Sequence, residues 1–186
     1  MRRITCEGFE RDDGLWDIEG TLLDTKPTKI ELVEKTIPAG EPIHRMMLRL
    51  TIDRERVIRD VHALTLDSPH KVCGNIAASY RQLIGLRVEP GFTKTAKRMF
   101  RGILGCSHLT ELLPPMATTA FQILWSDAKK TAEHANKSGR RGESPLGGCH
   151  ALRLDGEVVA IHFRHLLPAS DAAPDAAAQG EHGNGP

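Results

Sequence analysis

Residues 43–53, IHRMMLRLTID, place their apolar side chains on one face of an extended chain: Met46, Leu48, Leu50 and Ile52. This period of two is typical of a strand that is buried on one side. A short charged turn separates the stretch from a second extended run, residues 57–67, VIRDVHALTLD. The two runs predict an antiparallel β-hairpin.

The segments around this hairpin complete a mixed pattern of strands and helices. Residues 14–24 alternate well enough to predict another strand. Apolar residues recur at helical spacing over residues 69–85, which places Cys73 at a strand-to-helix junction. Two further helices are predicted: a short basic one over residues 95–102, and a kinked or two-piece one over residues 106–125, which contains two prolines.

The C-terminal third is predicted to be less regular. Residues 127–148 are polar and glycine-rich, which indicates a mobile excursion, whereas residues 152–163 predict a terminal hairpin with a turn at Asp155-Gly156. Residues 168–186 consist mostly of Ala, Pro, Gly and Asp and predict a disordered tail. We therefore expect one α+β domain over residues 1–167, with a small antiparallel sheet, helices packed on one face and the late hairpin at its edge.

Composition argues against several functional classes. The net charge is +1 and aromatic residues make up 4% of the 186, so the chain offers little to attract or stack on nucleic acid. No apolar run approaches the roughly 20 residues that span a bilayer. The N-terminus also lacks the apolar stretch of an export signal. We expect a cytoplasmic protein without nucleic-acid or membrane partners, whose four cysteines are reduced.

Three of the four cysteines lie beside a histidine or a glycine, in the stretches CGN (73–75), GCSH (105–108) and GCH (148–150). Thiolate and imidazole are ligands of zinc, and thiolates hold iron-sulfur clusters. The candidate metal ligands are therefore His44, Cys73, Cys106, His108 and Cys149. Four converging ligands would suit tetrahedral zinc or a labile cluster, whereas three ligands and an open position would suit catalytic zinc.

The same region also contains a catalytic candidate, formed by Cys106, His108 and Glu111. Cys73 and Cys106 both lie at predicted helix N-termini, where the helix macrodipole favours the thiolate. A thiolate there could bind metal or act as a nucleophile. Glu111, about one turn after His108, could serve as a general base.

Several stretches together resemble the bacterial DUF2889 family of uncharacterised proteins: RRI (2–4), RDDGLWDIEG (11–20), LDTK (23–26), GCSHLTEL (105–112) and CHA (149–151). The resemblance covers nearly the whole chain before the tail. It implies membership of a family and no particular activity.

A second resemblance concerns the order of strand, charged turn, strand and Cys73 opening a helix. This order is similar to the core of NifU/IscU-type iron-sulfur scaffold proteins, and the glycine-cysteine pair at Cys106 resembles their last cysteine. The resemblance implies a SufE/NifU-like fold and matches two of three cysteine positions. The first cysteine is missing, and His44 could stand in for the neighbouring aspartate. Cys149 or His108 could supply the absent ligand.

Three functions remain open and are ranked in this order. The first is a zinc or iron-sulfur protein that holds its metal for a protein partner, and it predicts stoichiometric metal. The second is a small metal-dependent hydrolase or lyase, which predicts a closed apolar pocket around Cys106, His108 and Glu111 for a small-molecule substrate. The third is a non-catalytic interaction module, which predicts buried cysteines scattered in space. The identity of the metal, substrate or partner and the oligomeric state stay open.

Overall fold

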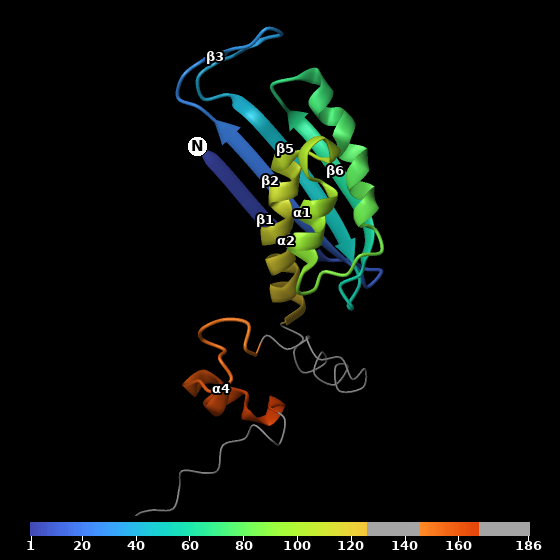
Figure 1. Ribbon diagram of the computed structural model, residues 1–186, viewed down its shortest axis with the longest axis vertical. Helices are drawn as coiled ribbons and strands as arrows, with labels where there is room; N and C mark the ends of the chain where they lie inside the picture. The colour runs from blue at the N-terminus through green and yellow to red at the C-terminus, as the bar shows by residue number, and fades with distance from the viewer. Residues whose placement is uncertain (126–145, 168–186) are drawn as a thin grey trace, which may run out of the picture. The chain divides into compact units, whose positions relative to one another are not determined.

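The computed structural model describes residues 1–125 and 146–167 (Figure 1). The chain forms two compact units, Met1–Ala128 and Lys129–Pro186. The expected single domain over residues 1–167 stays a prediction. Most of the expected polar excursion and the whole of the expected tail lie outside the described residues.

Four antiparallel strands form the sheet of the first unit, in the order β1-β2-β5-β6. They are β1 (Arg2–Glu10), β2 (Trp16–Thr25), β5 (Pro42–Ile52) and β6 (Ile58–Asp67). The hairpin predicted around the turn at residues 53–56 is confirmed by β5 and β6, and the earlier predicted strand by β2. Strand β1 was not predicted, because it is an edge strand with mostly exposed side chains and therefore weak apolar alternation.

The connection between β2 and β5 contains a second, two-stranded sheet. Its strands are β3 (Ile30–Glu31) and β4 (Thr36–Ile37), which pair antiparallel. Each of these strands is two residues long, which is too short for an apolar alternation to predict it within this polar, proline-containing connection.

Helical segments cover one face of the four-stranded sheet: η1 (Lys71–Leu83), α1 (Phe92–Met99) and α2 (Ser107–Trp125). Figure 1 shows α1 and α2 lying across the sheet, and η1 packs along β6. The core lies between the two layers and includes Ile18, Leu22, Leu48, Leu50, Tyr80, Leu109 and Leu112, all at most 1% exposed. The arrangement confirms the predicted α+β fold with helices on one face.

Two helices differ in detail from the prediction. Segment η1 is a 3₁₀ helix, in which only Tyr80 and Leu83 are buried. Helix α2 continues through Pro114 and Pro115 as one helix, so of the two predicted alternatives the two-piece helix is wrong and the kink stays a prediction. Each interior proline costs roughly 3 kcal/mol in a helix. The apolar face of α2 offsets this cost, because it is buried against β1 and β2 along its length.

The register of the sheet brings three polar residues into one row. Arg2 of β1 lies opposite Asp24 of β2, and Asp24 lies opposite His44 of β5. Because side chains alternate along a strand, Asp24 points to the same face as Leu22, which is buried beneath the helices. Ionisable side chains therefore border the apolar core at this end of the sheet.

In the second unit, residues 146–167 contain α4 (Glu157–His162) and η3 (Arg164–Leu166). The terminal hairpin predicted over residues 152–163 is therefore wrong. A short apolar run with β-branched residues does not distinguish strand from helix, and here Gly156 precedes the helix with Glu157 favourably placed in its first turn. No helix within the described residues is both long and apolar enough to span a membrane.

Candidate metal centre

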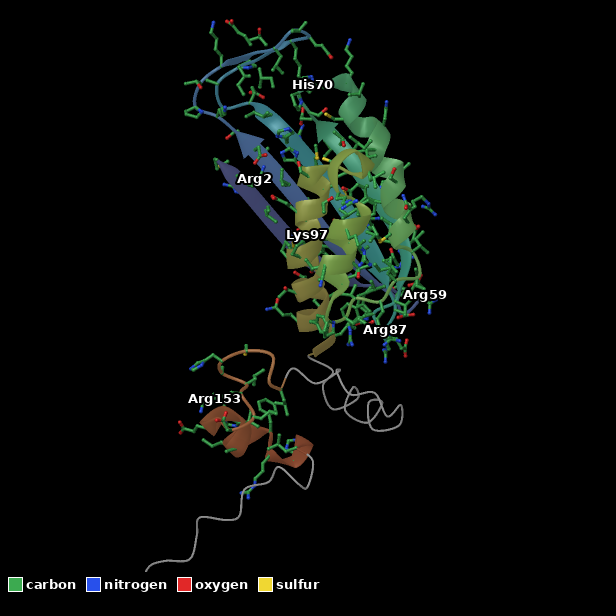
Figure 2. All side chains as sticks on the ribbon, viewed as in Figure 1. Arg2, Arg59, His70, Arg87, Lys97 and Arg153 are labelled. Carbon is green, nitrogen blue, oxygen red and sulfur yellow. The ribbon has the colours of Figure 1, made fainter. Side chains whose placement is uncertain are left out.

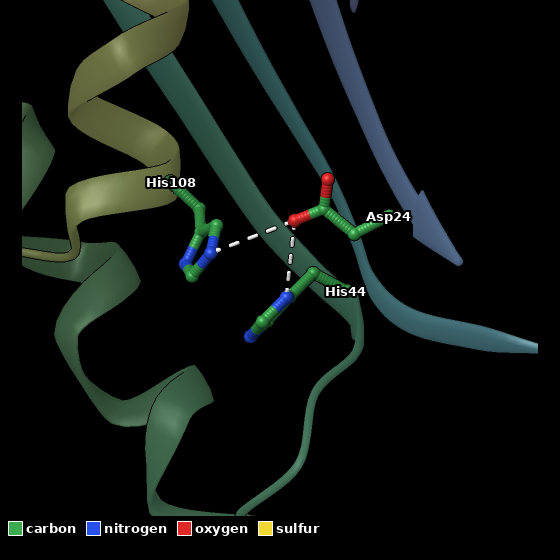
Figure 3. Close-up of side chains that lie close together, drawn as sticks. All are labelled: Asp24, His44 and His108. Carbon is green, nitrogen blue, oxygen red and sulfur yellow. Dashed lines mark hydrogen bonds and ion pairs between the residues drawn. The ribbon is translucent and has the colours of Figure 1, made fainter. Parts of the chain in front are cut away.

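Three side chains from three elements meet at the end of the sheet where β2 ends and β5 begins (Figure 3). Asp24 comes from β2, His44 from β5 and His108 from the first turn of α2. Oδ2 of Asp24 lies 3.2 Å from Nδ1 of His44 and 3.6 Å from Nε2 of His108. The two imidazole rings stack with their centroids 3.7 Å apart and their planes inclined by 28°. One carboxylate oxygen of Asp24 thus interacts with both histidines.

Arg2 orients the carboxylate of Asp24. Its Nε donates to Oδ1 and its Nη2 donates to Oδ2, both at 2.8 Å. Its Nη1 also donates to Oε2 of Glu111 at 2.7 Å. A bidentate pair between arginine and a carboxylate fixes geometry as well as charge. Arg2 therefore ties the end of β2 to the beginning of α2.

The surroundings set the protonation state of the three central side chains. The hydrogen bonds from Arg2 lower the pKa of Asp24 below its usual 3.8. Burial lowers the pKa of His44 and of His108 below the usual 6.5. Repulsion from His108 lowers the pKa of His44 further, and repulsion from Arg2 lowers the pKa of His108 further. The negative charge of Asp24 raises the pKa of each histidine, but the lowering effects are larger. At neutral pH the site is therefore a carboxylate with two neutral imidazoles, the forms in which these groups bind metal ions.

Stability should fall in acid because of the two histidines. Their pKa values are lower in the folded chain than the 6.5 of an unfolded one, so below about pH 6.5 the unfolded chain binds protons that the folded chain does not. We expect the free energy of unfolding to decrease as the pH falls from 6.5 toward the folded-state pKa values. Urea unfolding in EDTA at several pH values measures this dependence. It should flatten in a His44→Gln/His108→Gln variant and stay unchanged in a control that replaces the exposed His62; equal profiles for all three proteins would contradict the interpretation.

The first turn of α2, which carries His108, is fixed by the buried Tyr80. The tyrosine hydroxyl accepts a hydrogen bond from the backbone nitrogen of Cys106 at 3.0 Å. It also lies 2.8 Å from the carbonyl oxygen of Cys106 and 2.7 Å from Oγ1 of Thr110, so it has a partner for its own proton. One side chain of η1 thereby positions the start of α2.

Tyr80→Phe should destabilise the protein because it leaves these buried polar groups without a partner. The expected loss is about 1–3 kcal/mol of the free energy of unfolding. Chemical denaturation measures it. The control is Thr118→Ala, which removes an exposed hydroxyl of α2 and should change stability by less than about 0.5 kcal/mol. Equal stability of the Tyr80→Phe variant and the unmodified protein would show that the hydroxyl does not hold the turn.

Cys106 lies on the side of the His108 ring that Asp24 does not occupy. Its Sγ is 3.9 Å from Nδ1 of His108, whereas Nε2 of the same ring is the atom near Asp24. The sulfur also lies 3.8 Å from Sδ of Met46. The residue before it must be small, because a Cβ on Gly105 would lie 2.6 Å from the carbonyl oxygen of Phe100. The cysteine therefore contacts His108 at the nitrogen that faces away from the carboxylate.

A pocket of about 750 Å³ adjoins the two histidines. It lies between η1, the connection from α1 to α2 and the beginning of β5. Its size is in the range of clefts that bind small organic molecules. The pocket is open at its edge, where the lining residues Val72 and Ile103 are 69% and 95% exposed. It thus differs from the closed apolar pocket expected around the catalytic candidates.

The structure brings most of the predicted site residues together. His44 and His108 stack, and the same pocket is lined by Cys73, Cys106 and Glu111. Cys149 is exposed in the second unit. Of the four cysteines, three are half-buried and one is exposed, although the interaction-module hypothesis expected burial. The roles predicted for the cysteines and for Glu111 stay predictions.

Two residues of the site, Asp24 and Arg2, were missed as functional residues. Asp24 stands in a strand whose apolar partners face the core, and it is 9% exposed. A carboxylate on the buried face of a strand is a signal that the sequence contained, since such groups are buried only when paired. The arginine at the start of β1 carried no such signal, because β1 itself was not predicted.

Asp24, His44 and His108 form a group that could hold a metal ion. One ligand atom from each lies within 4.8 Å of the others, and in the described part of the chain no cysteine belongs to such a group. Two ligands about 2.1 Å from a tetrahedral ion are roughly 3.4 Å apart, and the distances of 3.2 and 3.6 Å from Asp24 bracket this value. An imidazole nitrogen binds a metal in the plane of its ring, so the two stacked rings would turn apart to share one ion.

The comparisons with known proteins confirm the first resemblance over residues 1–122 and do not extend it to the stretch at 149–151. The model of the family DUF2889, described as a protein of unknown function, matches residues 1–122. The match includes the whole four-stranded sheet and the three residues of the candidate metal centre. No curated protein and no solved structure matches the chain, so the similarity to NifU/IscU-type scaffolds stays a prediction. The chain belongs to the DUF2889 family.

Proposed function

We propose that the protein binds one divalent transition-metal ion through Asp24, His44 and His108 and uses it on a small organic substrate in the adjoining pocket. The observation that carries the proposal is the convergence of three ligand atoms within 4.8 Å of one another. Two neutral imidazoles and one carboxylate are a ligand set of catalytic zinc and of non-haem iron(II). Three protein ligands leave a coordination position open, as catalysis requires and structural sites do not.

The surroundings support a catalytic use over storage of metal for another protein. The pocket reaches both histidines, so a bound small molecule would lie next to the ligands. A metal ion held there would act as a Lewis acid or lower the pKa of a bound water, which suits a hydrolase or lyase. Arg2 would keep Asp24 ionised and oriented, and Cys106 would contact the second nitrogen of His108, the place of an outer-shell partner. An iron-sulfur cluster is less well supported, because clusters are held by cysteine thiolates.

The test is metal titration of the full chain after treatment with EDTA. We expect one equivalent of Zn²⁺ to bind in calorimetry, and Co²⁺ to give visible absorption bands without the intense near-ultraviolet band of thiolate ligation. Affinity should fall as the pH is lowered, because both imidazoles must be neutral to bind. Absence of stoichiometric binding would overturn the proposal. A strong thiolate-to-cobalt band would overturn the ligand set in favour of cysteines.

A second function is favoured by one specific observation, the alignment of Cys106, His108 and Asp24. The two ring nitrogens of His108 face the sulfur at 3.9 Å and the carboxylate at 3.6 Å. This is the order of a nucleophile, a general base and an orienting carboxylate, and such contacts are often looser before substrate binds. In this alternative, no metal takes part: the sulfur attacks the carbonyl carbon of an ester or thioester as its proton passes to Nδ1 of His108. The bond from that carbon to the alcohol oxygen or thiol sulfur then breaks, the departing alcohol or thiol takes the proton from Nδ1, and the acyl group is left on Cys106 as a thioester.

Alkylation by iodoacetamide in EDTA tests this alternative. A cysteine paired with His108 should be modified before the exposed Cys149, although Cys106 is half-buried. Mass spectrometry locates the modified residue, and His108→Gln should slow modification at Cys106 alone. If the order of modification follows exposure in both proteins, the cysteine is not activated and the alternative fails.

A further inference from the structure

Apolar side chains line one wall of the pocket, beside the two histidines of the metal centre. Met46 and Phe100 line it and are 1% and 3% exposed, so they form its base. Ile76 is half-buried on η1, and Val72 and Ile103 extend the apolar surface to the edge. A molecule in contact with this wall would need an apolar body in addition to any group that reaches the histidines.

The charged side chains of the pocket are predominantly basic. Lys97 of α1 and Arg101, four residues later, both line it. Both are exposed, and neither has an acidic partner within salt-bridge distance among the residues that the structure describes. The acidic lining residue, Glu111, already has a partner in Arg2 at 2.7 Å. Figure 2 labels Lys97 on the helical layer and Arg2 on the edge strand β1.

Lys97 and Arg101, which have no acidic partner among the described residues, lie beside a neutral apolar surface, and this combination favours an anionic ligand. We propose that the pocket binds a small organic carboxylate with an apolar body, whose carboxylate lies at Lys97 and Arg101 and whose apolar part contacts Met46, Ile76 and Phe100. A lysine and an arginine on one wall provide charge and several hydrogen-bond donors to a carboxylate. Transformation of this ligand at His44 and His108 rests on the proposed metal function, whereas its binding does not.

Methyl NMR of the full chain in EDTA tests the proposal. Octanoate is the probe, and octanol is the uncharged control compound with the same number of carbon atoms. We expect octanoate to shift the methyl signals of Met46, Ile76 and Ile103. Octanol should bind roughly tenfold more weakly than octanoate, because it cannot form the two ion pairs. Two partly exposed ion pairs of about 0.7 kcal/mol each amount to a factor of ten in affinity. Lys97→Gln/Arg101→Gln should weaken octanoate binding by the same factor of roughly ten without changing octanol binding.

The matched control is Lys94→Gln/Arg98→Gln. It also removes one lysine and one arginine, but from positions of α1 that do not line the pocket. Octanoate affinity should be unchanged in this variant. The proposal is overturned if octanoate causes no shifts up to its solubility, if octanol binds as tightly, or if the two double variants lose affinity equally. Because the titration contains EDTA, its result is independent of the Zn²⁺ titration, and failure of either proposal is seen separately.

Discussion

Replacing His108 by alanine is expected to lower the affinity of the protein for Zn²⁺ by more than about 100-fold, because replacing even a partner outside the ligand shell typically costs 10- to 100-fold. His44→Ala and Asp24→Asn should act in the same direction, since each removes one of the three converging ligand atoms or its charge. Calorimetric titration after EDTA treatment measures the affinity.

Two comparisons make this prediction specific. His62→Ala removes an exposed histidine of β6 and should leave the affinity unchanged, although it removes the same chemical group. Cys106→Ala should lower the affinity by less than His108→Ala, because the sulfur lies at the far nitrogen of the ring. A loss after Cys106→Ala that exceeds the loss after His108→Ala would mean that the thiolate is itself a ligand. Thermal unfolding of each variant verifies that the fold is retained.

The largest effect on stability is expected for Leu112→Ala, at about 2–5 kcal/mol. Leu112 is fully buried on α2. A Cβ placed on Gly20 of β2 would lie 3.5 Å from the Cβ of Leu112, so the helix and the sheet are in close contact there. Truncation leaves a cavity in this contact. The strand cannot move in to fill it, because both of its neighbours in the sheet hold it.

Urea unfolding measures the change, with Leu104→Ala as the control. Leu104 is 55% exposed, so its truncation should cost less than about 0.5 kcal/mol. Leu112 stands four residues after His108 and therefore lies on the same side of α2. We expect Leu112→Ala to weaken Zn²⁺ binding as well, and Leu104→Ala to leave it unchanged. Equal stabilities of the two variants would contradict the packing described between α2 and β2.

Local patterns in the sequence were sufficient for those elements whose burial is regular. The alternation of Met46, Leu48, Leu50 and Ile52 predicted β5, because a strand with one buried face repeats every two residues. The segment after Gly156 was mistaken for a strand because it is too short to show a helical period. Strand β1 left no pattern, because its outer edge and most of its side chains face solvent.

The candidate site was predictable only in part. His44 and His108 were singled out by their chemistry, and they do come together. Their shared partner, Asp24, was not singled out, because its role depends on the register of β2 against β1 and β5. A shift of that register by one residue would move its side chain to the opposite face of the sheet.

By itself, the sequence determined the α+β class, the central hairpin and the long apolar helix after Cys106, since each follows from the spacing of apolar residues along a short segment. Only the tertiary structure decided that Asp24, His44 and His108 meet and that Cys106 takes the far side of the ring. The three ligand candidates are separated by 20 and 64 residues, 44 minus 24 and 108 minus 44. No local period relates positions so far apart, and their meeting depends on strand pairing and on the packing of α2 against the sheet.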